Sequence, residues 1–354
     1  MVGEIPDGEA KAATRLRRVR TRRFGDTDLE ASEIGFGTWA LGSTWWGEVS
    51  EESGERLLLE ALDLGVTFFE TGDAYGQGAN EELVGRVLRP HRDRIQLSSK
   101  FGYVLDSNRR EHSEGERPQR WDGPFVRQAL EASLTRLGTD HLDLYQLHNP
   151  RLEAIDSDEC FATLDELRAE GKIAQYGVAL GPAIGWRDEG LRAISSRRIA
   201  SVQTVYNLLE QDPGRDFLEA AVDHDVGVIA RVPTSSGLLD DNLTLETTFG
   251  PGDHRRHRPR EWLVEGLEKI ERIRFLCGPE TGRTMAQAAL RFILAQPQMT
   301  VVIPTITNRA ELQEYTAATD VPELTDEELS RVDELYRHNF GVDARRPGLA
   351  TQSR

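Results

Sequence analysis

Lysine is nearly absent from this chain, and cysteine, methionine and long apolar runs are also scarce. The two cysteines form no CxxC pair or Cys/His cluster, so neither a disulfide framework nor a metal site is expected. Apolar stretches such as Val301–Pro304 fall far short of the roughly 20 residues that cross a bilayer. The N-terminus also lacks the apolar segment of a secretory signal. We therefore expect a cytoplasmic protein that does not associate with membranes.

Positive charge is in deficit as well. Lys and Arg together number 43 against 60 Asp and Glu, which gives a net charge of −17. Such a balance argues against nucleic acid as the main partner, because phosphate binding needs a basic surface. The one basic cluster is Arg15–Arg23, which we interpret as part of a mobile N-terminal arm over residues 1–22.

Short runs of β-forming residues recur along the chain, and helical patterns separate most of them. Most are about 25–35 residues apart, the length of one βα unit. The eight runs are Glu33–Trp39, Val66–Thr71, Ile95–Lys100, Leu142–His148, Gln175–Leu180, Ser201–Tyr206, Gly227–Val232 and Thr300–Pro304. Eight alternating units predict a (β/α)8 barrel, the TIM-barrel class of α/β fold.

The segments between these runs carry helix boundaries. Gln128–Leu137 and Cys160–Glu170 each stop before a glycine, and Thr284–Gln296 stops before a proline. An extra helix, Asp326–Arg337, follows the last run and opens with a capping box at Thr325.

We assign residues 23–340 to the barrel, with an arm or hairpin before it, and residues 341–354 to a C-terminal tail. Two connections are unusually long, Thr234–Arg260 and Tyr103–Trp121. Both follow strands, so they emerge on the face where barrels hold their active sites. They are either covers over a ligand or tolerated surface insertions, and the sequence favours neither.

Four ionisable residues lie at or just after predicted strand ends: Glu70, Tyr75, Lys100 and His148. A tyrosine is a weak acid at neutral pH, and a nearby ammonium group lowers its pKa by stabilising the phenolate. A carboxylate beside the lysine holds its position and charge, and a histidine can orient a carbonyl group. Together these residues predict a proton-transfer site.

The sequence resembles the aldo-keto reductase family over about Arg23 to Leu335. The motifs that carry the resemblance are Phe36–Trp39, Phe69–Gly76 with Glu81–Gly85, Ser99–Gly102, Arg136–His148 and Gly171–Gly177. The family implies hydride transfer from a nicotinamide cofactor to an aldehyde or ketone, assisted by an Asp/Tyr/Lys/His tetrad. Tyr75, Lys100 and His148 match three of its members, and Glu70 replaces the usual Asp.

The resemblance also implies where the cofactor lies. The residues concerned are Thr38, Trp39, Gln203, Arg231, Thr234, Ser235, Gly237, Leu238, Thr305, Thr307, Arg309 and Glu311. Arg231 replaces an aromatic residue that usually stacks on the nicotinamide, and Ala179-Leu180 replaces a Ser-Asn pair that binds the carboxamide. A planar guanidinium can also stack on a ring.

NADP is the usual cofactor of the family, but the residues leave NAD as an alternative. Arg309 is a candidate ligand for a 2′-phosphate, whereas a carboxylate such as Glu311 favours a 2′-hydroxyl.

Trp45, Trp46, Tyr103 and Trp121 are candidates for the pocket of a small carbonyl substrate. Two other functions stay open at this point. The departures at Glu70, Ala179, Leu180 and Arg231 suit a nicotinamide-binding module with little turnover, and the same tetrad suits a different redox step. The oligomeric state does not follow from the sequence.

Overall fold

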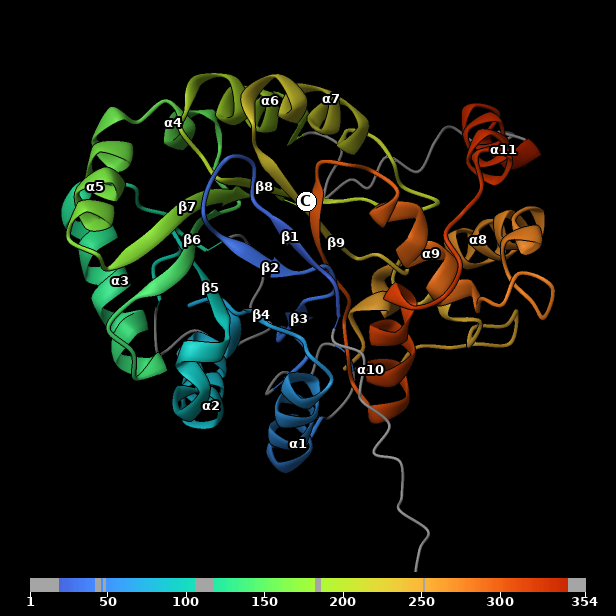
Figure 1. The fold of residues 1–354 in the computed structure, drawn as a ribbon, viewed down its shortest axis with the longest axis horizontal. Coiled ribbons are helices and arrows are strands. Elements are labelled where there is room, and N and C mark those ends of the chain that lie inside the picture. The colour runs from blue at the N-terminus through green and yellow to red at the C-terminus, as the bar shows by residue number, and fades with distance from the viewer. Residues whose placement is uncertain are drawn as a thin grey trace, which may run out of the picture.

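The computed structural model describes residues 19–41, 46, 49–105, 117–181, 186–250 and 252–342. Figure 1 shows a ring of strands surrounded by helices, with the arm-like first strands lying across one end. Within the described residues, no helix is both long enough and apolar enough to span a membrane.

Eight parallel strands form the ring, in the order in which they occur along the chain. They are β3 (Phe36–Gly37), β4 (Phe68–Glu70), β5 (Gln96–Phe101), β6 (Leu142–His148), β7 (Ile173–Ala179), β8 (Ser201–Val205), β9 (Gly227–Arg231) and β10 (Met299–Ile303). Parallel bridges from Ile34 to Val302 and from Gly37 to Thr305 join the first strand to the last. The predicted (β/α)8 barrel is confirmed, with strand ends that differ from the expected ones by a few residues.

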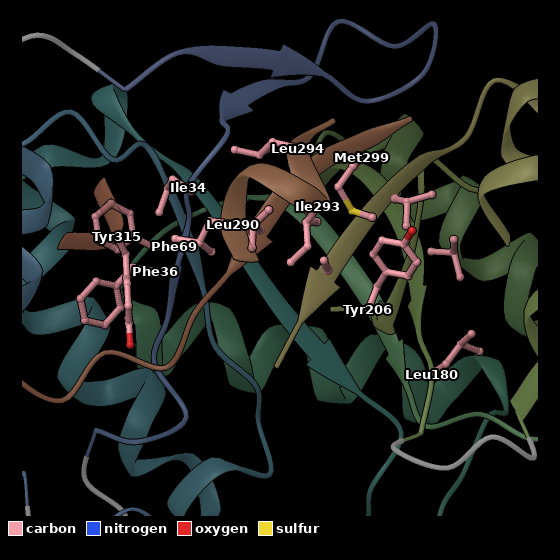
Figure 2. Close-up of a cluster of buried hydrophobic side chains, with 14 of the residues drawn as sticks. Ile34, Phe36, Phe69, Leu180, Tyr206, Leu290, Ile293, Leu294, Met299 and Tyr315 are labelled. Atoms are coloured by element: carbon pink, nitrogen blue, oxygen red, sulfur yellow. The ribbon is translucent and has the colours of Figure 1, made fainter. Parts of the chain in front are cut away.

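Helices cover the outside of this ring. They are α1 (Glu51–Asp63), α2 (Ala79–Leu88), α3 (Gly123–Leu137), α4 (Leu152–Ile155), α5 (Asp158–Ala169), α6 (Arg187–Ser196), α7 (Gly214–His224), α8 (Arg260–Arg272), α9 (Met285–Leu294), α10 (Arg309–Thr316) and α11 (Asp326–Arg337). The extra C-terminal helix α11 has the predicted bounds and the predicted capping box between Thr325 and Glu328. Figure 2 draws part of the apolar layer beneath the helices, including Leu290, Ile293 and Leu294 of α9 and Met299 of β10.

A hairpin of β1 (Thr21–Arg23) and β2 (Glu30–Ser32) closes the N-terminal end of the barrel. The Arg22 guanidinium donates to the carbonyl oxygens of Leu294 (2.8 Å) and Met299 (2.9 Å) and pairs with Glu33 at 2.7 Å. Residues 21 and 22, which the sequence analysis assigned to the arm, belong to β1 of this hairpin. Most of the predicted arm lies outside the described residues.

Two buried helix glycines provide a test of how tightly the outer layer packs. A Cβ on Gly85 of α2 would lie 2.5 Å from the backbone oxygen of Leu137, whereas one on Gly54 of α1 would meet Leu41 at an ordinary 3.5 Å. We expect Gly85→Ala to lower the free energy of unfolding by about 1–3 kcal/mol through overpacking. Gly54→Ala should leave it unchanged or raise it by up to about 1 kcal/mol, since alanine favours helix. Urea unfolding of both variants distinguishes these effects, and equal shifts would contradict the packing described.

Candidate active site

The predicted catalytic side chains lie at the C-terminal ends of three adjacent strands. Glu70 ends β4, Lys100 is the penultimate residue of β5 and His148 ends β6. Tyr75 opens the 3₁₀ helix Tyr75–Gly78 that follows β4. The barrel thus brings together four groups from three separate segments of the sequence, on the face where barrels carry out chemistry.

Lys100 is the centre of this group. Its side chain is only 1% exposed, and Nζ donates to the Tyr75 hydroxyl at 2.9 Å and to the carbonyl oxygen of Thr71 at 2.8 Å. Nζ also forms an ion pair with Glu70 Oε1. The longer glutamate therefore still reaches the lysine.

His148 lies edge-on to the rings of Tyr75 and Tyr103, with centroids 5.8 and 5.0 Å away. Asn149 donates from Nδ2 to the Tyr103 hydroxyl at 2.8 Å, and Gln119 donates from Nε2 to the His148 carbonyl oxygen at 2.8 Å. Asn149 adopts φ 52°, a left-handed conformation that asparagine tolerates. The sequence reasoning missed both Gln119 and Asn149. Of the two, only Asn149 carried a signal in the sequence, because it directly follows a strand end.

Burial dominates the electrostatics of the site. It raises the pKa of Tyr75 above its usual value, and the Arg231 charge opposes this rise. Burial, followed by the charges of Lys100 and Arg231, lowers the pKa of His148 well below its usual value. Burial also lowers the pKa of Lys100, although the Glu70 carboxylate in contact favours its charged form. At neutral pH, Tyr75 keeps its proton and His148 is uncharged.

Gln203 and Arg231 extend the site across the barrel mouth. Gln203 of β8 donates from Nε2 to Glu70 Oε1 at 3.2 Å. Arg231 ends β9 and donates from Nη2 to the Leu180 carbonyl oxygen at 2.7 Å. Its guanidinium therefore reaches from β9 to the end of β7.

These groups fit a nicotinamide ring. Gln203 offers an amide to a carboxamide, and Arg231 offers a planar face to a ring. Two buried ring nitrogens, Nδ1 of His148 and Nε1 of Trp46, have no hydrogen-bond partner in the described structure. Together, this amide, this guanidinium and these ring nitrogens suit a ligand that combines an aromatic ring with amide and hydroxyl groups.

Thr38 lies beneath the rim rather than on it. It is fully buried, and its hydroxyl bonds to the Glu70 carbonyl oxygen at 3.0 Å and to Asn80 Oδ1. Asn80 in turn donates to the carbonyl oxygens of Thr38 (2.8 Å) and Leu41 (2.6 Å). Asn80, which the sequence reasoning missed, thereby ties the loop after β3 to the loop after β4.

The segment after β9 turns back sharply. Ser235, Ser236 and Gly237 all have positive φ, and the Gly237 N–H donates to the Thr234 carbonyl oxygen at 3.1 Å. The Leu238 side chain is buried in the core. A ligand bound at this turn would therefore contact the backbone of the turn and the short side chains that precede Leu238.

Acidic side chains surround the start of α10. Glu311 Oε2 accepts hydrogen bonds from the Thr307 N–H (2.7 Å) and from the Thr307 hydroxyl (2.9 Å). Arg309 Nε donates to Glu60 Oε1 at 2.6 Å. Thr305 forms the bridge to Gly37 that closes the barrel. The charge of Arg309 is thus already matched by a carboxylate.

A second carboxylate, Asp240, lies close to this end of the site. It accepts a hydrogen bond from the Tyr315 hydroxyl at 3.0 Å. Burial, opposed by the hydrogen bonds from Tyr315 and Thr234 and assisted by repulsion from Glu311 and Glu314, raises the pKa of Asp240 to about 7. Asp240 was not among the predicted site residues.

The long connection after β9 folds back over the rim. Its His254 lies 5.4 Å from the Trp39 ring and 4.5 Å from the Trp46 ring, and Arg255 lies 4.6 Å above Trp46. This contact joins the connection to the loop after β3, which favours the covering role over a plain insertion. Trp45 lies outside the described residues.

Trp121 packs closely against the end of β5. Its ring lies edge-on to Phe101 at 5.8 Å, and a Cβ on Gly102 would lie 2.3 Å from it. Together with Tyr103, it forms one wall of the rim beside His148.

Comparisons with known proteins agree with this geometry. The sequence profile described as "Aldo/keto reductase family" matches residues 33–337. The chain belongs to this family. Aldo-keto reductase YhdN of Bacillus subtilis is 33% identical over 77% of this chain and 81% of its own. Aldo-keto reductase yakc of Schizosaccharomyces pombe, named for NADP(+), is 30% identical over 93% of this chain and 95% of its own.

Solved structures give the same result. The glycerol dehydrogenase AKR11B4 from Gluconobacter oxydans superposes with a TM-score of 0.77 and 27% identity, over 93% of this chain and 98% of its own. This aldo-keto reductase is therefore a nicotinamide-dependent oxidoreductase by family.

The Lys100–Glu70 pair predicts a large effect on stability. Glu70→Gln leaves a buried ammonium without its counter-charge, so we expect the free energy of unfolding to fall by about 3–5 kcal/mol. Glu70→Asp keeps the charge and should lose much less. Glu70→Gln combined with Lys100→Met should recover much of the loss. Urea unfolding measures all three, and a Glu70→Gln protein as stable as the wild type would contradict a charged pair.

Proposed function

We propose that this enzyme reduces an aldehyde or ketone to the alcohol, with Tyr75 donating the proton. The observation that carries the proposal is the hydrogen bond from Lys100 Nζ to the Tyr75 hydroxyl at the barrel mouth. A bound reduced nicotinamide supplies the hydride. Small aldehydes, ketones and oxidised sugars are all candidate substrates. The similarity to a protein named glycerol dehydrogenase favours carbonyl compounds that carry hydroxyl groups among them.

Each member of the group has a distinct role in this proposal. Tyr75 holds a proton at neutral pH and delivers it to the carbonyl oxygen, while Lys100 stabilises the phenolate that remains. Neutral His148 orients the carbonyl oxygen through a ring nitrogen. Glu70, held by Gln203, keeps Lys100 charged and in place.

We also propose NADH as the preferred cofactor. Glu311 occupies the Thr307 N–H and hydroxyl, and Glu60 pairs with Arg309, so a 2′-phosphate at the start of α10 would have to displace a carboxylate from each of these groups. A carboxylate there favours a ribose 2′-hydroxyl. The relative named for NADP(+) argues in the opposite direction, so the choice needs direct measurement.

Tyr75→Phe tests the proton donor. We expect kcat for carbonyl reduction to fall by about 100-fold or more, because general acid catalysis typically contributes that much. Cofactor affinity should change little. Tyr145→Phe is the matched control, since it removes a buried tyrosine hydroxyl without a hydrogen-bond partner. Cofactor binding without turnover in the wild type would instead favour the binding-module alternative.

The pH dependence tests the same residue. Reduction needs protonated Tyr75, and burial holds its pKa above the usual value of 10. We therefore expect the reduction rate to stay level from about pH 6 to pH 9, and the reverse alcohol oxidation to rise with pH. A reduction rate that fell steeply between pH 7 and pH 8 would contradict this.

Glu311→Gln tests the cofactor preference. Removing the negative charge should strengthen NADPH binding several-fold, with little change for NADH, because only the 2′-phosphate gains from it. Fluorescence titration with both nucleotides measures the ratio. Glu327→Gln on α11 is a control for the same change in charge elsewhere. A wild type that already prefers NADPH would disprove the NADH proposal and leave the reductase proposal intact.

A further inference from the structure

Arg231 has no counter-charge among the residues that the structure describes. No carboxylate within the described residues lies close enough to form an ion pair with it, and its one hydrogen bond is to the Leu180 carbonyl oxygen. Its Nε is buried and has no acceptor. Leaving a half-buried guanidinium with one buried N–H unpaired is unfavourable, so a structural role alone does not explain it.

The other charges of the site do not compensate for Arg231. Lys100 and Glu70 neutralise each other, and Tyr75 and His148 are uncharged at neutral pH. The nearby acid Asp73 has a raised pKa, because burial and then Glu81 disfavour its charged form. Among the described groups at the centre of the site, Arg231 is therefore the cation that no carboxylate contacts.

This charge acts on the site as a whole. It affects the pKa values of Tyr75, which follows β4, of Lys100 on β5 and of His148 on β6. The guanidinium reaches from β9 to the end of β7, and Gln203 lies on β8 between them. Any ring held by Gln203 and facing Tyr75 must lie close to this cation.

We propose that Arg231 makes the enzyme hold the reduced nicotinamide more tightly than the oxidised form, so that the reduced cofactor loads in preference and the oxidised cofactor is released readily. The proposal rests on the proposed function. The two forms share the same outline, but the oxidised ring carries a positive charge and the reduced ring does not. Repulsion by Arg231 therefore opposes only the oxidised form. The overall reaction equilibrium is unchanged, and the effect lies in binding and release of the cofactor.

Calorimetric titration with NADH and NAD⁺ tests this without any turnover. We expect the wild type to bind NADH more tightly. In Arg231→Met the NAD⁺ to NADH ratio of Kd values should fall by about tenfold, mainly through tighter NAD⁺ binding, which corresponds to about 30 mV in the potential of the bound couple. Arg231→Lys should keep most of the preference. Arg127→Met, which removes an exposed charge on α3, is the control.

The outcomes separate the hypotheses. A ratio that stays within twofold in Arg231→Met overturns the proposal, as does a wild type that binds NAD⁺ at least as tightly. If the ratio is unchanged but the variant loses a preference for a carboxylate-bearing aldehyde over its methyl ester, the charge serves an anionic substrate instead. Failure of the wild type to bind NADH, NADPH or their oxidised forms would disprove the proposed function itself. Arg231→Gln replaces the methionine variant if that protein does not fold.

Discussion

The ion pair between Lys100 and Glu70 is the constraint on which the active site depends. An ammonium and a carboxylate, each almost completely removed from water, are tolerated only as partners. The pair joins β5 to β4, and Gln203 ties it to β8 on another part of the ring. Lys100 also donates to the Tyr75 hydroxyl, so the proposed proton donor is held by the same buried pair that links β4 and β5.

The remainder of the barrel protects this arrangement from both ends. The hairpin of β1 and β2, anchored by Arg22, closes the N-terminal end and leaves the opposite end as the one accessible to a ligand. At that opposite end, the connection after β9 contacts the loop after β3 through His254, Trp39 and Trp46. Lys100 and Glu70 are almost completely buried, which strengthens the electrostatic interaction between them.

The order of the strands and the four proposed catalytic residues were predictable because each has a local signal. Apolar runs at βα spacing indicate parallel strands, and an isolated lysine at the end of an apolar strand indicates a buried partner. Exact strand ends were less predictable, as β3 shows, because hydrogen bonds to neighbouring strands decide where pairing stops. Asn80, Gln119, Asn149 and Asp240 had weak signals, since their roles arise only from contacts across the fold.

By itself, the sequence determined the barrel class, the extra helix α11 and the identity of the ionisable groups at the strand ends. These depend on periodicity and capping, which are properties of short segments. Only the tertiary structure decided which charges neutralise one another: Lys100 with Glu70, Arg309 with Glu60, and Arg231 with no carboxylate among the described residues. Such pairings depend on distances of a few ångströms between segments that are remote in the chain, and no local pattern encodes them.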